Sequence, residues 1–140
     1  MQARVSWDGR MTFKGTADTG FTVPLGASPV VGGDEDGFRP MELILVGLAG
    51  CTAMDVISIL KKTKQDISSF EVKVQAEQSS EHPKVFNKIS IEFIVSGHHV
   101  DSAAVDRSIE LSSTKYCPVQ AMLGDSVPIE TSATIIELSQ

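Results

Sequence analysis

One long apolar segment, residues 40–62, limits the folds that are open to this chain. Pro40 is suited to a first helical position, Glu42 follows within the first turn, and Lys61 and Lys62 stand at the far end. These charges complement the helix dipole. Residues 43–60 are apolar or small on nearly every side. We therefore predict a helix over residues 40–62 that is buried in protein on most of its faces.

A membrane span is the alternative interpretation of this segment. Such a span needs about 20 apolar residues, and the carboxylate of Asp55 inside the run would be costly in lipid. A stretch of small residues also crosses the middle of the segment: Gly47, Ala49, Gly50, Cys51 and Ala53. Because this stretch has little side-chain bulk, we expect a second helix to pack closely against it, and no membrane contact.

Short apolar pieces separated by turn residues precede the predicted helix. Residues 5–7 and 11–13 flank Asp8-Gly9, a pair that favours a tight type I′ turn between antiparallel strands. Residues 26–39 are rich in Gly, Pro, Ser and acidic side chains, which indicates a solvated loop.

Alternating apolar and polar residues follow the predicted helix. Residues 70–78 and 88–95 have this pattern, which is typical of half-buried strands, and residues 79–84 are polar enough for a connecting turn.

The last part of the chain predicts two further helices and a strand. Asp101 is placed to cap a helix reaching about residue 113, and Pro118 opens a short helix that ends at Gly124. A final strand is expected over residues 127–138. The whole is predicted to be one α+β domain over residues 1–140, with antiparallel strands at both ends and a buried helix in the middle.

Composition excludes several classes of protein. The chain has 140 residues and a formal net charge of −6, so it offers no basic surface for nucleic acid. A chain of this size can bury a sufficient core without disulfides or metals. The first ten residues place charged side chains where a signal peptide needs an apolar run, so we expect a cytoplasmic protein.

The two cysteines are the candidates for chemistry. Cys117 directly precedes Pro118, and a cysteine at a helix start is expected to have a lowered pKa. Cys51 lies well inside its predicted helix, so its thiolate would need a cation from Arg39 or Arg10. The competing interpretation is that both thiols are inert and only pack in the core.

Three motifs together resemble the OsmC/Ohr family of osmotically inducible and organic hydroperoxide resistance proteins. They are Pro40-Met41-Glu42-Leu43, Ala49-Gly50-Cys51-Thr52-Ala53-Met54-Asp55-Val56 and Tyr116-Cys117-Pro118-Val119. The resemblance covers nearly the whole chain. It implies an OsmC-like α+β fold, in which antiparallel sheets wrap a long buried central helix, and an intertwined homodimer with active sites at the subunit interface.

The resemblance also implies an activity, that of an antioxidant, stress-response enzyme without cofactor or metal. Cys51 would be the peroxidatic thiol that attacks an organic hydroperoxide, and Cys117 would resolve the resulting sulfenic acid as a disulfide. A dithiol reductant would then restore both thiols. These roles require Cys51 to be the more readily ionised thiol, whereas the position of Cys117 at a helix start predicts a lower pKa for Cys117.

The cation that activates the family's peroxidases is an Arg held by a Glu directly after the helix-opening Pro. Here that position is Met41, and the nearest carboxylate is Glu42. Arg39 with Glu42 is therefore the expected activating pair, with Arg10 as the alternative Arg. The absence of Glu at position 41 is also the best argument for a rival function, a non-enzymatic protein of this fold that binds a small ligand or senses oxidation.

Apolar walls would favour an alkyl hydroperoxide as substrate. The residues expected to line the substrate site are Met41, Leu45, Met54 and Met122.

Asp55 and the three histidines are interpreted as structural residues. We expect Asp55 to pair with a lysine or a backbone amide rather than to act in catalysis. His82, His98 and His99 are expected on the surface and not in a zinc site with the cysteines.

Overall fold

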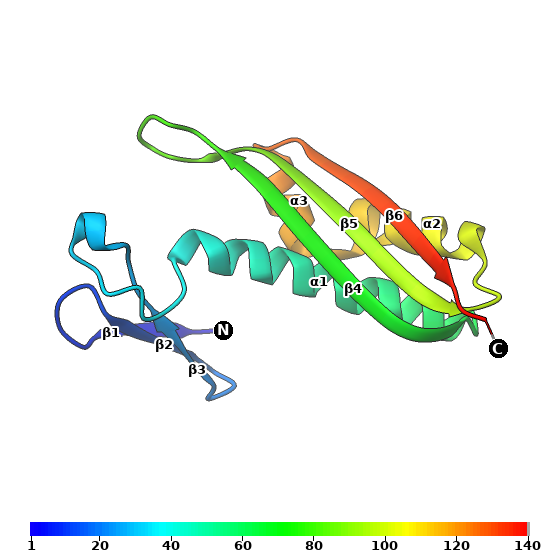
Figure 1. Ribbon diagram of the computed structural model, residues 1–140, viewed down its shortest axis with the longest axis horizontal. Helices are drawn as coiled ribbons and strands as arrows, with labels where there is room; N and C mark the ends of the chain where they lie inside the picture. Colours follow the sequence, from blue (N-terminus) through cyan, green and yellow to red (C-terminus); the bar gives the residue numbers. More distant parts are fainter. Residues whose placement is uncertain (140) are drawn as a thin grey trace. The chain divides into compact units, whose positions relative to one another are not determined.

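The computed structural model describes residues 1–139 and divides the chain into two compact units, Met1–Ile44 and Leu45–Gln140. The first unit contains a three-stranded antiparallel sheet in the order β1-β2-β3. Its elements are β1 (Ala3–Trp7), β2 (Phe13–Ala17), β3 (Thr22–Leu25) and the short 3-10 helix η1 (Pro29–Val31). Figure 1 shows these elements in blue and cyan. That one domain unites both units stays a prediction.

The hairpin between β1 and β2 is confirmed, but its predicted tight turn is wrong. Trp7 pairs with Phe13, so residues 8–12 form the connection. Both Gly9 and Arg10 have positive φ angles, of 99° and 49°. The amide of Thr12 donates to the carbonyl of Gly9 at 3.0 Å. With the amide of Asp8 also bonded to the carbonyl of Thr12 at 2.8 Å, the connection is longer than a two-residue turn.

The central helix α1 spans Pro40–Lys62, as predicted. The backbone amide of Arg39 donates to a carboxylate oxygen of Glu42 at 2.8 Å, which satisfies an amide at the start of the helix. The fully buried residues of α1 recur every fourth position: Leu48, Thr52, Val56 and Leu60. This spacing places them on one face of the helix, where they form part of the core of the second unit.

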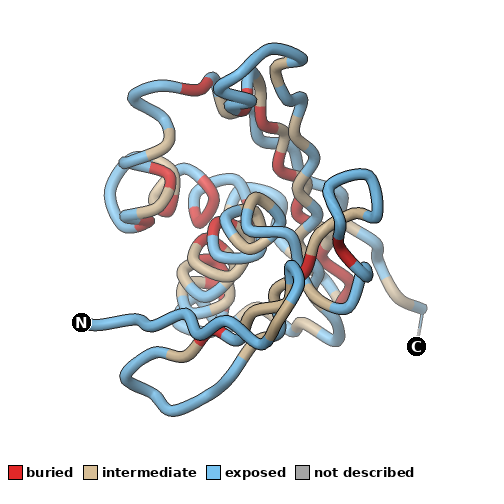
Figure 2. The backbone as a smooth tube through the Cα atoms, turned by 90° about the vertical axis from the view of Figure 1, so that its left-hand side faces the viewer, coloured by how far each residue is buried: buried red, intermediate tan, exposed pale blue. Residues whose placement is uncertain are grey.

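The expectation that α1 is buried on most faces is wrong for the single chain. Val46 is 56% exposed and Met54 is 73% exposed, because none of the described residues of the second unit covers their faces of the helix. Figure 2 shows buried residues as short, interrupted stretches of the chain. By length and composition α1 could cross a membrane, but its buried stripe makes it the core helix of an α+β unit.

The second unit contains a mixed three-stranded sheet in the order β4-β5-β6. The hairpin of β4 (Asp66–Gln78) and β5 (Phe86–His98) is antiparallel and longer than predicted. By contrast β6 (Ile129–Glu137) is parallel to β5, so the expectation of antiparallel strands at the end of the chain is wrong. The helical segment between β5 and β6 returns the chain along the sheet, and β6 therefore starts beside Ile89, near the beginning of β5.

Helices cover one face of this sheet (Figure 1). They are α1, α2 (Ser102–Leu111) and α3 (Pro118–Gly124), and the π-helical turn η2 (Ser112–Tyr116) joins the last two. Alternate side chains of β5 are buried: Ile89, Ile91, Phe93 and Val95. The other face of the sheet has charged residues such as Lys73 and Glu92. The predicted α+β class is confirmed.

Both predicted caps of the later helices are confirmed. A carboxylate oxygen of Asp101 accepts from the amide of Ala103 at 3.0 Å, and Cys117 is the N-cap of α3 with Pro118 as its first residue. The turn η2 brings the chain from α2 to this cap, where the amide of Cys117 donates to the carbonyl of Ser112 at 2.9 Å. The side chains of Ser112 and Cys117 thereby come to the same region of the unit.

Candidate functional site

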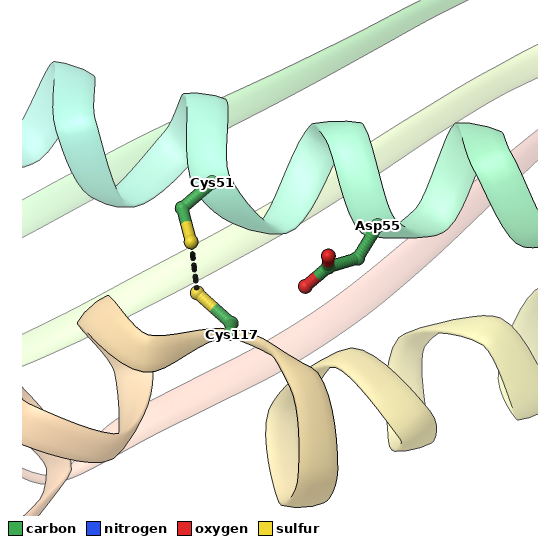
Figure 3. Close-up of side chains that lie close together, drawn as sticks. All are labelled: Cys51, Asp55 and Cys117. Carbon is green, nitrogen blue, oxygen red and sulfur yellow. Dashed lines mark hydrogen bonds between the residues drawn. The ribbon is translucent and has the colours of Figure 1, made fainter.

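Two cysteines far apart in the sequence meet between α1 and α3. Cys51 lies near the middle of α1, Cys117 lies at the N-cap of α3, and their sulfurs are 3.0 Å apart. Figure 3 shows the two side chains pointing toward each other. Both are free thiols, since a disulfide would bring the sulfurs to about 2.05 Å. The thiol of Cys117 donates a hydrogen bond to the sulfur of Cys51.

Burial decides the acidity of Cys117. The residue is 3% exposed, and burial together with the hydrogen bond to Cys51 raises the pKa of its thiol from 9.0 to about 11. The amide of Gln120 donates to the Cys117 sulfur at 3.4 Å and lowers this pKa only in part. The expectation of an acidic Cys117 is therefore wrong, although the cap geometry behind it is confirmed.

A carboxylate completes the group of reactive side chains. Asp55 follows Cys51 by one helical turn, so both project from the same face of α1. A carboxylate oxygen of Asp55 and the two sulfurs all lie within 4.8 Å of one another. Figure 3 shows the carboxylate beside the sulfur pair. The hydroxyl of Ser112 donates to Asp55 at 2.9 Å, so the expected lysine or backbone partner is replaced by a serine.

A buried chain of polar side chains leads to this carboxylate. Ser112 has one hydroxyl proton and donates it to Asp55, so the 2.7 Å bond between Thr52 and Ser112 has Thr52 as its donor. The amide nitrogen of Gln120 donates to the Thr52 hydroxyl at 3.1 Å. Each group in this series therefore donates its hydrogen bond to the next, and the series ends at Asp55, which accepts.

Sequence reasoning missed the roles of Thr52, Ser112 and Gln120. Ser112 is four residues after the buried Ser108, and Thr52 is four residues before the buried Val56. A hydroxyl on a buried face needs a partner, and this was the available signal. Which hydroxyl meets which is decided by the packing of α1 against η2 and α3.

The candidate activating residues have partners in the first unit. The Arg10 guanidinium forms an ion pair with Asp34 at 2.9 Å, which raises the pKa of Arg10. The Arg39 guanidinium contacts Glu35 at 3.2 Å in an exposed pair. Glu42 accepts from the Arg39 backbone amide rather than from its side chain.

The expected substrate-site residues lie on α1 and α3. Met41 and Leu45 are half-buried, whereas Met54 is 73% exposed and Met122 is 68% exposed. Of the histidines, His82 and His99 are exposed and His98 contacts the carbonyl of Leu138 at 3.1 Å.

Comparison with known proteins agrees with the motifs. Residues 32–132 match the family described as OsmC-like protein. Protein YhfA of Escherichia coli K12 is 40% identical over 136 residues, which span 97% of this chain and 98% of YhfA.

Solved structures share the fold. A hypothetical protein from Aquifex aeolicus VF5 is 26% identical with a TM-score of 0.86, covering 99% of this chain and 97% of its own. An organic hydroperoxide resistance protein OsmC from Legionella pneumophila is 13% identical with a TM-score of 0.73, covering 95% of each chain. The family match and the 40% identity together show that this chain belongs to the OsmC-like protein family.

Proposed function

We propose that this protein is a thiol-dependent peroxidase that reduces organic hydroperoxides through Cys51 and Cys117. The observation that carries the proposal is the 3.0 Å distance between the two sulfurs. At that distance a disulfide can form with only a small movement of two side chains. The fold shared with organic hydroperoxide resistance proteins supports the class of reaction by analogy alone.

Cys51 is the attacking thiol in this proposal. Its thiolate attacks the terminal peroxide oxygen, the O–O bond breaks, and Cys51 becomes a sulfenic acid, while the alkoxide leaves and takes up from solvent the proton that the Cys51 thiol had released. The properties of Cys117 support this assignment, because a buried thiol with a pKa of about 11 remains protonated near neutral pH. Cys51 is more exposed than Cys117 and can meet the substrate.

Cys117 then resolves the sulfenic acid. Its sulfur bonds to the Cys51 sulfur, and the displaced hydroxyl leaves as water with the proton of the Cys117 thiol. A dithiol reductant exchanges with the new disulfide, is itself oxidised to a disulfide, and restores both thiols. One peroxide and one dithiol are consumed in each cycle.

Activation of Cys51 is assigned to Arg39, the residue directly before α1. Its only side-chain partner among the described residues is Glu35, in a pair whose members are both more than half exposed. Such a pair is weak, so the guanidinium can exchange partners. Glu42 contributes by capping the start of α1 through the Arg39 amide. Arg10 is the alternative activator, and its shorter contact with Asp34 makes it the less available of the two.

A homodimer and an apolar substrate site are further parts of the proposal. The exposed apolar side chains of α1, with Met54 among them, are surfaces that a second copy of the chain would cover. Met41, Leu45, Met54 and Met122 are proposed to contact the alkyl group of the substrate. The cytoplasm, where thiols are kept reduced, is the proposed location.

Peroxide consumption tests the proposed activity. The reduced protein is mixed with cumene hydroperoxide and a dithiol in the presence of a metal chelator, and the loss of peroxide is followed. We expect Cys51→Ser to abolish turnover, and Cys117→Ser to permit one equivalent of peroxide loss without disulfide formation. Equal rates in the wild type and the Cys51→Ser variant would remove Cys51 from the mechanism.

One observation favours the rival function, a redox sensor or small-ligand protein. The charged group beside the thiols is the Asp55 carboxylate, which does not stabilise a neighbouring thiolate. In a sensor, one equivalent of peroxide would still link Cys51 to Cys117, but the dithiol would not support repeated turnover. Mass spectrometry of the disulfide, combined with the steady-state rate, separates the two functions. Thiols that stay free after peroxide treatment would leave only the ligand-binding alternative.

A further inference from the structure

We propose that the reduced site binds a single thiophilic divalent cation, such as Zn²⁺, through Cys51, Cys117 and Asp55. Sulfur and carboxylate ligands in this combination suit zinc, and three protein ligands with one open position are typical of sites that also accept water or another small ligand. The proposal does not depend on peroxidase activity, because it concerns the dithiol before any oxidant arrives.

The geometry of the three ligand atoms supports the site. In tetrahedral coordination with Zn–S bonds of about 2.3 Å, two bound sulfurs stand about 3.8 Å apart and a sulfur and a carboxylate oxygen about 3.6 Å apart. The atoms already lie within 4.8 Å of one another. The two sulfurs, which are 3.0 Å apart, must move apart slightly to bind the cation. Small rotations of the two cysteine side chains allow this movement.

The surroundings of each ligand also support the site. Metal ligands are commonly oriented by hydrogen bonds from neighbouring groups. The Ser112 hydroxyl holds one oxygen of Asp55 at 2.9 Å, which leaves the other oxygen available for a cation. The series of hydrogen bonds from Gln120 through Thr52 and Ser112 ends at this carboxylate and holds it in place. The Gln120 amide donates to the Cys117 sulfur and stabilises its thiolate.

Charge provides the physical reason for a cation. Two thiolates and a carboxylate at these distances would repel one another, so without a cation Cys117 keeps its proton and donates it to Cys51. Binding of Zn²⁺ replaces the two thiol protons, releases them to solvent, and converts the repulsion into attraction. Among the described residues, this is the one cluster of three or more metal-ligand side chains whose ligand atoms lie so close together.

Oxidation should release the metal. When an organic hydroperoxide oxidises the two bound thiolates to a disulfide, it takes two electrons and two protons and becomes an alcohol and water. The disulfide no longer offers thiolate ligands, and the cation is left with Asp55 alone. Bound zinc would in turn occupy both sulfurs and protect them from the oxidant.

Metal titration of the reduced protein, free of oxygen, tests the inference. We expect one equivalent of Zn²⁺ to bind in competition with a chromophoric chelator, with release of about two protons. Co²⁺ used as a probe should give thiolate-to-metal charge-transfer bands and the visible spectrum of a tetrahedral site. The disulfide form should show neither the binding nor the spectrum.

Variants identify the ligands. Cys51→Ser and Cys117→Ser should each lose the charge-transfer spectrum or weaken it strongly, and Asp55→Asn should lower the zinc affinity at least about tenfold. The matched control is Asp125→Asn, which changes an exposed aspartate near α3, and His99→Gln tests surface binding. Thermal unfolding checks that each variant is folded.

The outcomes decide the proposal without reference to enzyme activity. No binding at one equivalent, binding that survives oxidation, or an affinity that falls in His99→Gln but not in the cysteine variants would each overturn it. An unchanged affinity in folded Asp55→Asn would overturn the three-ligand site. Peroxide turnover is measured with a chelator present, so failure of the metal site and failure of the peroxidase are separate results.

Discussion

At the scale of single residues, Cys117 shows how burial can outweigh a favourable local position. Its place at an N-cap is expected to lower the thiol pKa, and the Gln120 amide does act in that direction. Burial and the hydrogen bond to Cys51 have the larger effect and raise the pKa to about 11. Cys117 is therefore suited to keep its proton until a partner sulfur is oxidised.

The two thiols should differ in their reactivity toward alkylation. At pH 8 we expect iodoacetamide to modify Cys51 well before Cys117, because Cys117 is both 3% exposed and protonated. Peptide mass mapping after short exposures measures the order. In Cys51→Ser, Cys117 should remain slow because its burial persists. Faster modification of Cys117 in the native protein would contradict the assigned roles.

The raised pKa of Cys117 also predicts a dependence of stability on pH. In the unfolded chain this thiol ionises near pH 9.0, whereas in the folded protein it keeps its proton until about pH 11. The folded state therefore binds more protons in this window, and its stability falls as pH rises through it. Urea unfolding from pH 8 to 10.5 should show a steeper loss for the wild type than for Cys117→Ser. Parallel profiles would contradict the raised pKa.

At the scale of elements, the site depends on how α1 meets the segment between β5 and β6. This segment returns the chain to the start of β5 and makes β6 parallel to it. On its way it places η2 and the cap of α3 against the buried face of α1, where Thr52 contacts both Ser112 and Gln120. The polar contacts therefore fix the position of the helix that carries Cys51 relative to the cap that carries Cys117.

Removal of the Thr52 hydroxyl should destabilise the protein. Thr52→Val keeps the shape of the side chain but removes the acceptor of the buried Gln120 amide and the donor to the Ser112 hydroxyl, which is expected to cost about 1–3 kcal/mol. Chemical denaturation measures the loss. Thr131→Val, at an exposed position on β6, is the matched control and should change stability little. Equal effects of the two substitutions would show that the buried contacts contribute nothing.

At the scale of the whole molecule, α1 has more apolar surface than one chain can cover. Its buried stripe belongs to the core of the second unit, while Val46 and Met54 remain exposed on other faces. Exposed apolar surface of this extent favours association with another copy. The proposed homodimer would bury it without any change in the fold of either chain.

Light scattering during size exclusion should give twice the chain mass of 15.0 kDa. We expect Val46→Glu to shift the protein toward monomer or aggregate, because it places a charge on the surface that a second copy would cover. Ile136→Glu is the control, since Ile136 lies on β6 with a similar exposure, 46% against 56% for Val46. A monomeric wild type, or equal effects of both substitutions, would contradict the dimer.

Local patterns in the sequence predicted the elements well. Pro40 and Lys62 bound α1, Asp101 caps α2, and Cys117 caps α3, because caps and periodicity act over one or two turns of chain. The motifs around both cysteines also led to the right family. The length of the first hairpin loop was not predicted, since the register pairs Trp7 with Phe13 and so leaves three residues beyond Asp8-Gly9 in the connection.

The sequence by itself therefore determined the helices, most strands and the identity of the cysteine pair. The tertiary structure decided the direction of β6, the 3.0 Å meeting of the sulfurs, the pKa of Cys117 and the place of Asp55 beside it. These properties depend on groups that are far apart along the chain. Burial and electrostatic interaction act through distances in space, so they are set only when α1 packs against η2 and α3.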